Sequence, residues 1–169
     1  ADSDAATVCW QMAMENMETP TALIFSRQNV KSLPEGTDYQ QTRKGAYIVT
    51  GSDEQFDVIL VASGSEVSTC VAGAELLRKD GVKVRVVSAP SEGLFRRQSK
   101  EYQEQILPRD AKIFGLTAGL PVTIEGLVGA NGKVFGLNSF GFSAPYTVLD
   151  EKLGFTPENV YKQVKEFLA

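Results

Sequence analysis

Residues 57–90 read DVILVASGSEVSTCVAGAELLRKDGVKVRVVSAP, and the pattern of this stretch decides the fold. Residues 58–62 form a short, uninterrupted apolar run, which is typical of a strand covered on both faces. A turn of serine and glycine follows at residues 63–65, and apolar residues then recur at helical spacing over residues 67–77. A second apolar run occupies residues 82–87. This order predicts a βαβ crossover, and therefore an α/β protein with an at least partly parallel sheet.

The helix between these two strands has a suitable cap at each end. Ser65 is a good N-cap, and Glu66 places a negative charge in the first turn, where the helix dipole favours it. Lys79 supplies a basic last turn, and Gly81 ends the helix.

The first part of the chain differs in character from the rest. Residues 2–17 are predicted to form a helix, capped by Asp2 or Ser3, and residues 21–26 a strand. Residues 27–44 are mostly polar and contain few apolar side chains, which is typical of a linker rather than of a loop within one domain.

The main domain is predicted to span residues 45–169 and to hold about five strands with helices on both faces. Its first strand, residues 46–50, is expected to be the antiparallel one, because the polar turn at residues 51–56 is too short for a crossover helix. Further strands are predicted at residues 112–116 and 134–137, and further helices at residues 90–97, 99–107, 145–153 and 157–168.

The composition excludes several classes of function. The chain has 169 residues, a net charge of −4 and no histidine, which excludes a Ser-His-Asp catalytic set and any histidine metal site. The longest basic cluster is Arg96-Arg97, too short for a nucleic-acid surface, and no apolar run approaches the roughly 20 residues that span a bilayer. No signal peptide is visible. Cys9 and Cys70 are expected to be reduced, buried thiols, which favours a cytoplasmic location.

Arg27 is the first candidate for a functional residue. It follows the predicted strand at residues 21–26 directly, so it is expected at the C-terminal edge of a strand, where open α/β sheets bind their ligands. A guanidinium there can hold a phosphate with two parallel hydrogen bonds. The alternative is a solvated surface arginine at the start of the linker.

The turn formed by Ser63, Gly64 and Ser65 is a weaker candidate, for an anion site. A strand, a turn of small residues and a helix N-terminus can cradle an anion on backbone N–H groups. Glu66 opposes this, because its negative charge occupies the place of the anion. A tight structural turn is the favoured interpretation.

Two other groups of residues are expected to be structural. In the loop at residues 138–143, Phe140 and Phe142 are expected to fill a crevice beside the strand at residues 134–137. Arg96, Arg97 and Lys100 are expected to form a solvated helical face.

Several segments resemble transketolases in the right order along almost the whole chain. They are PTALIFSRQN at residues 20–29, ASGSEV at residues 62–67, RVVSAPS at residues 85–91, NSFGFSAP at residues 138–145 and LGFTPENVYKQVKEFL at residues 153–168. The resemblance implies that residues 45–169 are a transketolase C-terminal domain, a three-layer α/β/α sandwich with one antiparallel strand. It also implies that residues 1–26 are the last helix and strand of the middle, pyrimidine-binding domain.

For the complete enzyme, the resemblance implies a transferase of the pentose phosphate pathway. Such an enzyme moves a two-carbon ketol unit between ketose and aldose phosphates, uses thiamine diphosphate with Mg or Ca, and is a homodimer. The arginine of the SRQN segment, here Arg27, is then expected to bind the substrate phosphate. The present chain has no GDG metal motif and no histidine, so it is expected to contain no catalytic residue or metal ligand, to be inactive alone and to bind no cofactor.

Two alternatives stay open at the level of sequence. The first is the C-terminal domain of another thiamine diphosphate enzyme, such as a deoxyxylulose-phosphate synthase or an oxo-acid dehydrogenase β subunit. The second is a stand-alone, non-catalytic binding module. The SRQN segment and the FGFSAP ending favour transketolase over the other thiamine enzymes.

Overall fold

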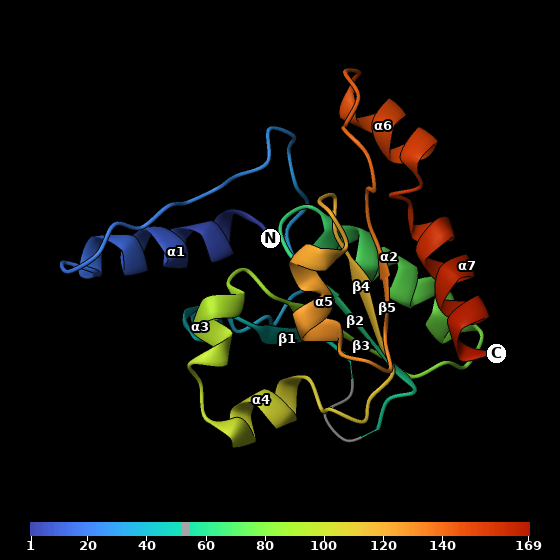
Figure 1. Cartoon of the computed structure of the whole chain (residues 1–169), viewed down its shortest axis with the longest axis horizontal. Helices are drawn as coiled ribbons and strands as arrows, with labels where there is room; N and C mark the ends of the chain where they lie inside the picture. The colour runs from blue at the N-terminus through green and yellow to red at the C-terminus, as the bar shows by residue number, and fades with distance from the viewer. Residues whose placement is uncertain (52–54) are drawn as a thin grey trace.

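A five-stranded sheet with the strand order β1-β3-β2-β4-β5 forms the centre of the molecule (Figure 1). The computed structural model describes residues 1–51 and 55–169, so the predicted turn at residues 51–56 lies partly outside the described residues. The strands are β1 (Tyr47–Thr50), β2 (Val58–Ala62), β3 (Val84–Ser88), β4 (Ile113–Leu116) and β5 (Lys133–Phe135). All neighbouring strands are parallel except β1, which pairs antiparallel with β3. The predicted mixed, mostly parallel sheet is confirmed.

Helices cover both faces of this sheet and complete a three-layer sandwich (Figure 1). The helices of the described chain are α1 (Ser3–Glu15), α2 (Glu66–Lys79), α3 (Glu92–Arg96), α4 (Lys100–Ile106), α5 (Val122–Val128), α6 (Tyr146–Leu153) and α7 (Pro157–Leu168), with the 3-10 helix η1 (Tyr39–Lys44). The long helices α2 and α7 pack on one face, and the short helices α3, α4 and α5 pack on the other. No helix within the described residues is long and apolar enough to cross a membrane.

The strand β2 shows why the apolar run predicts a central strand. Successive side chains of a strand point to opposite faces. Val58 and Leu60 join the core under α2 and α7, whereas Ile59 and Val61 join the core under α3, α4 and α5. Every residue of the strand is buried, so both cores require an apolar side chain at each position.

The ends of the helices agree with the sequence pattern, with one exception. Thr156 caps α7 by accepting a hydrogen bond from the Asn159 backbone N–H, and Gly81 follows α2 with φ +80°. Ser65 stands at the N-cap position of α2, but its side chain makes no capping bond. Its backbone is already helical, with φ −63° and ψ −31°, whereas a capping residue is usually extended. Its Oγ donates to Glu66 Oε1 at 2.9 Å.

The strand predicted at residues 21–26 does not form. This segment is extended but pairs with no strand of the described chain, and most of it is exposed, Ile24 to 94%. A strand is stable only where neighbours satisfy its backbone groups, and this chain places none beside it. The segment contacts α1 instead, where Phe25 stacks on Trp10 with 6.4 Å between ring centroids.

The segment predicted as a linker, residues 27–44, contains ordered contacts. Leu33 is buried in the core under α2, and η1 ends in Gly45 with φ +86°. The Asp2 carboxylate ties α1 to this segment by accepting hydrogen bonds from the Leu33 backbone N–H and the Tyr39 hydroxyl, both at 2.8 Å. The division of the chain into a fragment, a linker and a domain stays a prediction.

Helix α5 was not expected from the sequence pattern. Its first residues, Val122 to Ile124, are β-branched and Gly126 lies within it, and both features lower helix propensity. The helix forms because it packs on β4 at Gly115. A Cβ at that glycine would lie 2.8 Å from side-chain atoms of both Ile124 and Val128, so only glycine allows this close approach.

Candidate functional site

Arg27 lies on the exposed segment between α1 and η1. Within residues 1–51 and 55–169, its guanidinium takes part in no hydrogen bond or ion pair, so all its donors face solvent. Because residues 21–26 form no strand, the expected position at the end of a strand is wrong for this chain. The phosphate-binding role of Arg27 remains a prediction.

The residues after Arg27 line a cavity of about 350 Å³ at the N-terminal end of α2. Gln28 and Asn29 contribute one wall, and Ser65 and Glu66 contribute the wall that belongs to α2. In Figure 1 the loop after α1 reaches towards this end of the helix. The structure therefore brings the segment after Arg27 next to the serine–glycine turn, although 35 residues of chain separate Asn29 from Ser65.

Glu66 places a carboxyl group in the wall of this cavity. Burial raises the pKa of its carboxyl group, and the charge of Asp150 raises the pKa further, against hydrogen bonds such as the one from Ser65 that lower it. A carboxylate at the helix N-terminus competes with any bound anion for the same backbone N–H groups. The structural interpretation of the turn is thus favoured, and an anion site at Ser63, Gly64 and Ser65 stays a prediction.

Sequence reasoning missed the contribution of α6 to the same cavity. Tyr146 and Asp150 line it opposite Glu66, and burial raises the pKa of Asp150. No local sequence motif predicts that the carboxyl groups of Glu66 and Asp150 lie near each other. Asp150 and Glu66 lie on helices far apart in the sequence, and only the packing of α6 near the start of α2 makes them neighbours.

The loop at residues 138–143 does not fill a crevice, contrary to expectation. Phe140 is 98% exposed and Phe142 is 65% exposed. The loop leaves the sheet after its edge strand β5, and no described element packs over the two rings. Aromatic residues beside a strand were expected to pack there, but an edge strand has no further neighbour on one side to form a crevice.

The described residues do not fit a divalent metal or the diphosphate that such a metal would hold. No three aspartate, glutamate, cysteine or histidine side chains converge within residues 1–51 and 55–169. Magnesium and calcium need several oxygen ligands at close range.

Together these features define a class of protein: a three-layer α/β domain preceded by a helical segment. A family model described as "Transketolase-like TK C-terminal domain" matches residues 45–156. The chain belongs to this transketolase family.

Known relatives agree with this assignment. The transketolase of Staphylococcus epidermidis is 44% identical over 168 residues, which cover 98% of this chain and 25% of the relative. The chain thus spans about a quarter of the length of the curated relatives that it matches. It corresponds to the C-terminal part of a transketolase.

Solved structures give the same result. The transketolase of Leishmania mexicana superposes with a TM-score of 0.91 at 33% identity, over 99% of this chain and 24% of that one. The transketolase of Pichia stipitis in complex with sedoheptulose-7-phosphate has a TM-score of 0.90 at 32% identity, with the same coverage. Both structures support transketolase over the two alternatives that the sequence left open.

Proposed function

We propose that this chain is part of an enzyme that transfers a two-carbon ketol unit between ketose and aldose phosphates in the pentose phosphate pathway. Arg27 binds the phosphate of the sugar, and residues 45–169 act as a structural and assembly domain. The complete enzyme is a cytoplasmic homodimer, and parts of it outside this chain hold thiamine diphosphate and Mg or Ca. The cofactor, when bound, supplies the carbanion chemistry of the transfer.

The free guanidinium of Arg27 carries this proposal. It is exposed and forms no ion pair within the described residues. No interaction of the guanidinium with these residues therefore has to break when it binds a ligand. A planar guanidinium matches two phosphate oxygens at once. A sugar phosphate is the ligand to test, because the structure of the Pichia stipitis relative contains sedoheptulose-7-phosphate.

The test replaces Arg27 with alanine in the complete enzyme and compares glyceraldehyde-3-phosphate with glyceraldehyde as acceptors. Loss of a charge-assisted contact costs about 1.5–3 kcal/mol, so KM for the phosphorylated acceptor should rise about ten- to a hundredfold. KM for the unphosphorylated acceptor should change little. Arg27→Lys should lie between the two, because lysine keeps the charge but loses the planar fork.

Arg97→Ala is the matched control, since Arg97 is also exposed and also forms no ion pair within the described residues. It should leave both KM values unchanged. Equal losses with both acceptors in Arg27→Ala would show that Arg27 does not bind the phosphate.

A further inference from the structure

We infer that the cavity between α4 and α5 binds a small organic anion, a molecule that carries a phosphate or carboxylate beside an apolar group. The cavity has a volume of about 860 Å³, within the range of about 300–1,000 Å³ that small-molecule sites occupy. It lies on the face of the sheet covered by short helices, whereas the cavity beside Arg27 lies near α2 and α6. It is therefore a second site, and the inference does not depend on the proposed function.

The floor of the cavity consists of the edges of core residues that are each less than a tenth exposed. Phe95, Leu107, Ile113 and Leu127 line it from α3, the end of α4, β4 and α5. All four belong to the core of this face. Their edges offer a surface for the apolar part of a ligand.

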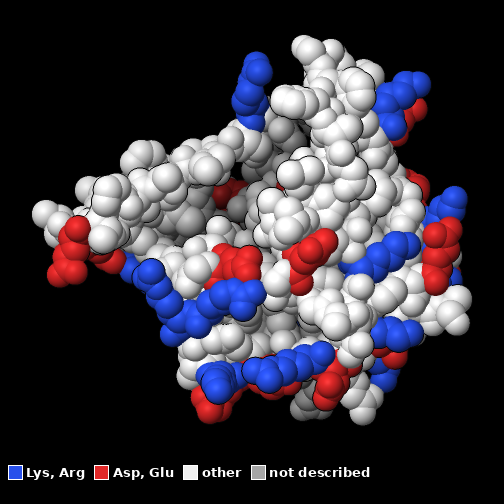
Figure 2. Space-filling view, in the orientation of Figure 1, with Lys and Arg blue, Asp and Glu red and all other residues white. Residues whose placement is uncertain are grey.

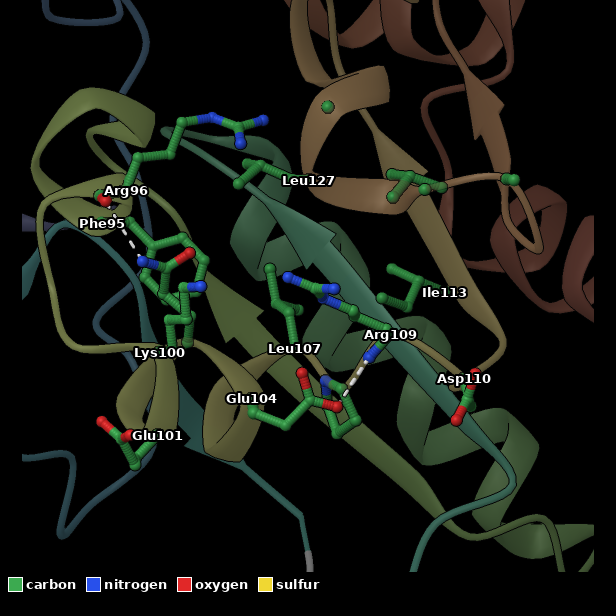
Figure 3. A pocket seen from close by; sticks show the side chains of 16 residues that line it. Phe95, Arg96, Lys100, Glu101, Glu104, Leu107, Arg109, Asp110, Ile113 and Leu127 are labelled. Atoms are coloured by element: carbon green, nitrogen blue, oxygen red, sulfur yellow. Dashed lines mark hydrogen bonds between the residues drawn. The ribbon is translucent and has the colours of Figure 1, made fainter.

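Three cationic side chains surround this floor. In Figure 3 the side chains of Lys100 and Arg109 point into the space between α4 and α5, and Arg96 extends above it towards α5. Arg96 also bonds Glu92 at 2.6 Å and passes over Gly126, where any Cβ would collide with its guanidinium. The expected solvated face of Arg96 and Lys100 is thus one wall of a cavity.

Two of these cations are free to bind an anion. Within the described residues, neither the Lys100 ammonium nor the Arg109 guanidinium makes a hydrogen bond or ion pair. The nearby Glu104 carboxylate accepts a hydrogen bond from the Arg109 backbone N–H at 3.0 Å, which holds the base of that side chain in place. The carboxylates of Glu101, Glu104 and Asp110 also line the cavity, so an anion is expected to bind at the Lys100 and Arg109 side chains and away from these three.

A purely structural role for Arg109 is already filled by another residue. Cations near a helix C-terminus often serve its unpaired carbonyl groups. At the end of α4, Arg85 does so by donating from Nη1 to the Gln105 carbonyl at 2.9 Å. Arg109 and Lys100 are therefore available for a ligand, and their convergence on an apolar floor favours an anion with an apolar body.

The test is an NMR titration of the 169-residue chain with phenyl phosphate and, separately, with benzoate. Saturable shifts are expected at the amides of Gly126, Leu127 and Arg109 with at least one of the two probes, and the tighter probe identifies the preferred anionic group. Inorganic phosphate should bind more weakly because it lacks the apolar ring. Phenol should bind more weakly because it lacks the anionic group. Arg109→Gln and Lys100→Gln should each weaken binding by about five- to tenfold, as expected for exposed charged contacts.

Arg97→Gln is the control, because Arg97 follows α3 directly but does not line the cavity, and it should leave the affinity unchanged. If either Arg109→Gln or Lys100→Gln fails to fold, the other variant still tests whether a cation of the cavity binds the probe. Absence of saturable shifts with both probes up to about 10 mM would overturn the inference, since binding weaker than that limit is not specific recognition. Equal weakening by Arg97→Gln, or shifts confined to other surfaces, would overturn it as well.

Discussion

At the scale of single residues, Asp2 joins segments that are separate in the sequence. Its buried carboxylate accepts hydrogen bonds from the Ala5 N–H at 3.0 Å, and from the Leu33 N–H and Tyr39 hydroxyl at 2.8 Å. Burial pushes the pKa of Asp2 upwards, but these hydrogen bonds outweigh it, and the net pKa is lowered. One side chain thus caps α1 and anchors the segment before η1.

Replacement of Asp2 by alanine should loosen α1 and residues 33–44 together. The loss of a cap and of two charge-assisted bonds predicts a cost of about 2–3 kcal/mol for opening this region. Hydrogen exchange at the Ala5 and Leu33 amides measures it directly. Asp4→Ala is the control, because Asp4 lies in the same turn but is exposed, and it should change these rates little.

The same carboxylate predicts a pH dependence. Because the folded pKa of Asp2 lies below the unfolded value of about 3.9, its contribution is present above that pH and is lost as the pH falls through the folded pKa. Exchange at Leu33 should therefore accelerate at acid pH relative to its intrinsic rate. In Asp2→Ala this extra acceleration should be absent, and its persistence would rule out Asp2 as the cause.

At the scale of elements, α2 and α7 pack against each other in the core on one face of the sandwich. Gly73 of α2 faces Val160 of α7, and a Cβ at that glycine would lie 2.8 Å from Val160 Cγ1. Such a distance requires one of the helices to move. Glycine at this position therefore serves packing, although it lowers the helix propensity of α2.

Gly73→Ala and Gly93→Ala should shift the stability of the domain in opposite directions. Gly93 lies in α3, and a Cβ there would meet nothing within 4 Å, so alanine should stabilise by about 0.5–1 kcal/mol. At Gly73 the overpacking should destabilise by about 1–2 kcal/mol. Urea unfolding measures both. A Gly73→Ala variant as stable as Gly93→Ala would contradict the packing argument, and adding Val160→Ala should relieve part of the loss.

At the scale of the whole molecule, the sandwich closes its core largely without α1. Trp10 and Phe25 stack on each other but remain 56% and 53% exposed, and Met14 and Met17 are also exposed. Figure 2 shows that the surface of α1 is largely uncharged, whereas charged side chains gather over α3 and α4. The first part of the chain thus has little core of its own.

Residues 45–169 are predicted to fold when produced alone. They contain all five strands and both cores apart from Leu33 and the N-terminal residues Ala5 and Val8, and about 125 residues suffice for an independent domain. Hydrogen exchange of the full chain should be slower in β2 and β3 than over residues 1–26. Unfolding of the truncated protein, or equally slow exchange in both regions of a dilute monomer, would contradict this prediction.

The 169-residue chain alone is predicted not to bind thiamine diphosphate and Mg²⁺. The reason is its set of donors, since it has no histidine and its described carboxylates do not converge in groups of three. Isothermal titration calorimetry with both compounds should show no saturable heat. A dissociation constant below about 100 μM, or about −5.5 kcal/mol, would show that the chain holds more of the cofactor site than expected.

Local pattern sufficed for most of the sheet and for the ends of the helices. Val58 to Ala62, the crossover helix and the Thr156 cap depend on neighbours in sequence, so propensity and periodicity identify them. Arg27 was selected by its predicted position after a strand and by a segment that resembles a known family. The chemistry of the arginine alone does not distinguish a ligand-binding residue from an ordinary surface cation.

The sequence by itself determined the α/β class, the parallel crossover, the antiparallel first strand and the family of this protein. Only the tertiary structure decided that residues 21–26 form no strand, that α5 is a helix and that Phe140 is exposed. The same holds for the cavity that brings Lys100 and Arg109 together. The reason is physical, because each of these features depends on which residues lie nearby in space, and that is set by the packing of elements distant in the chain.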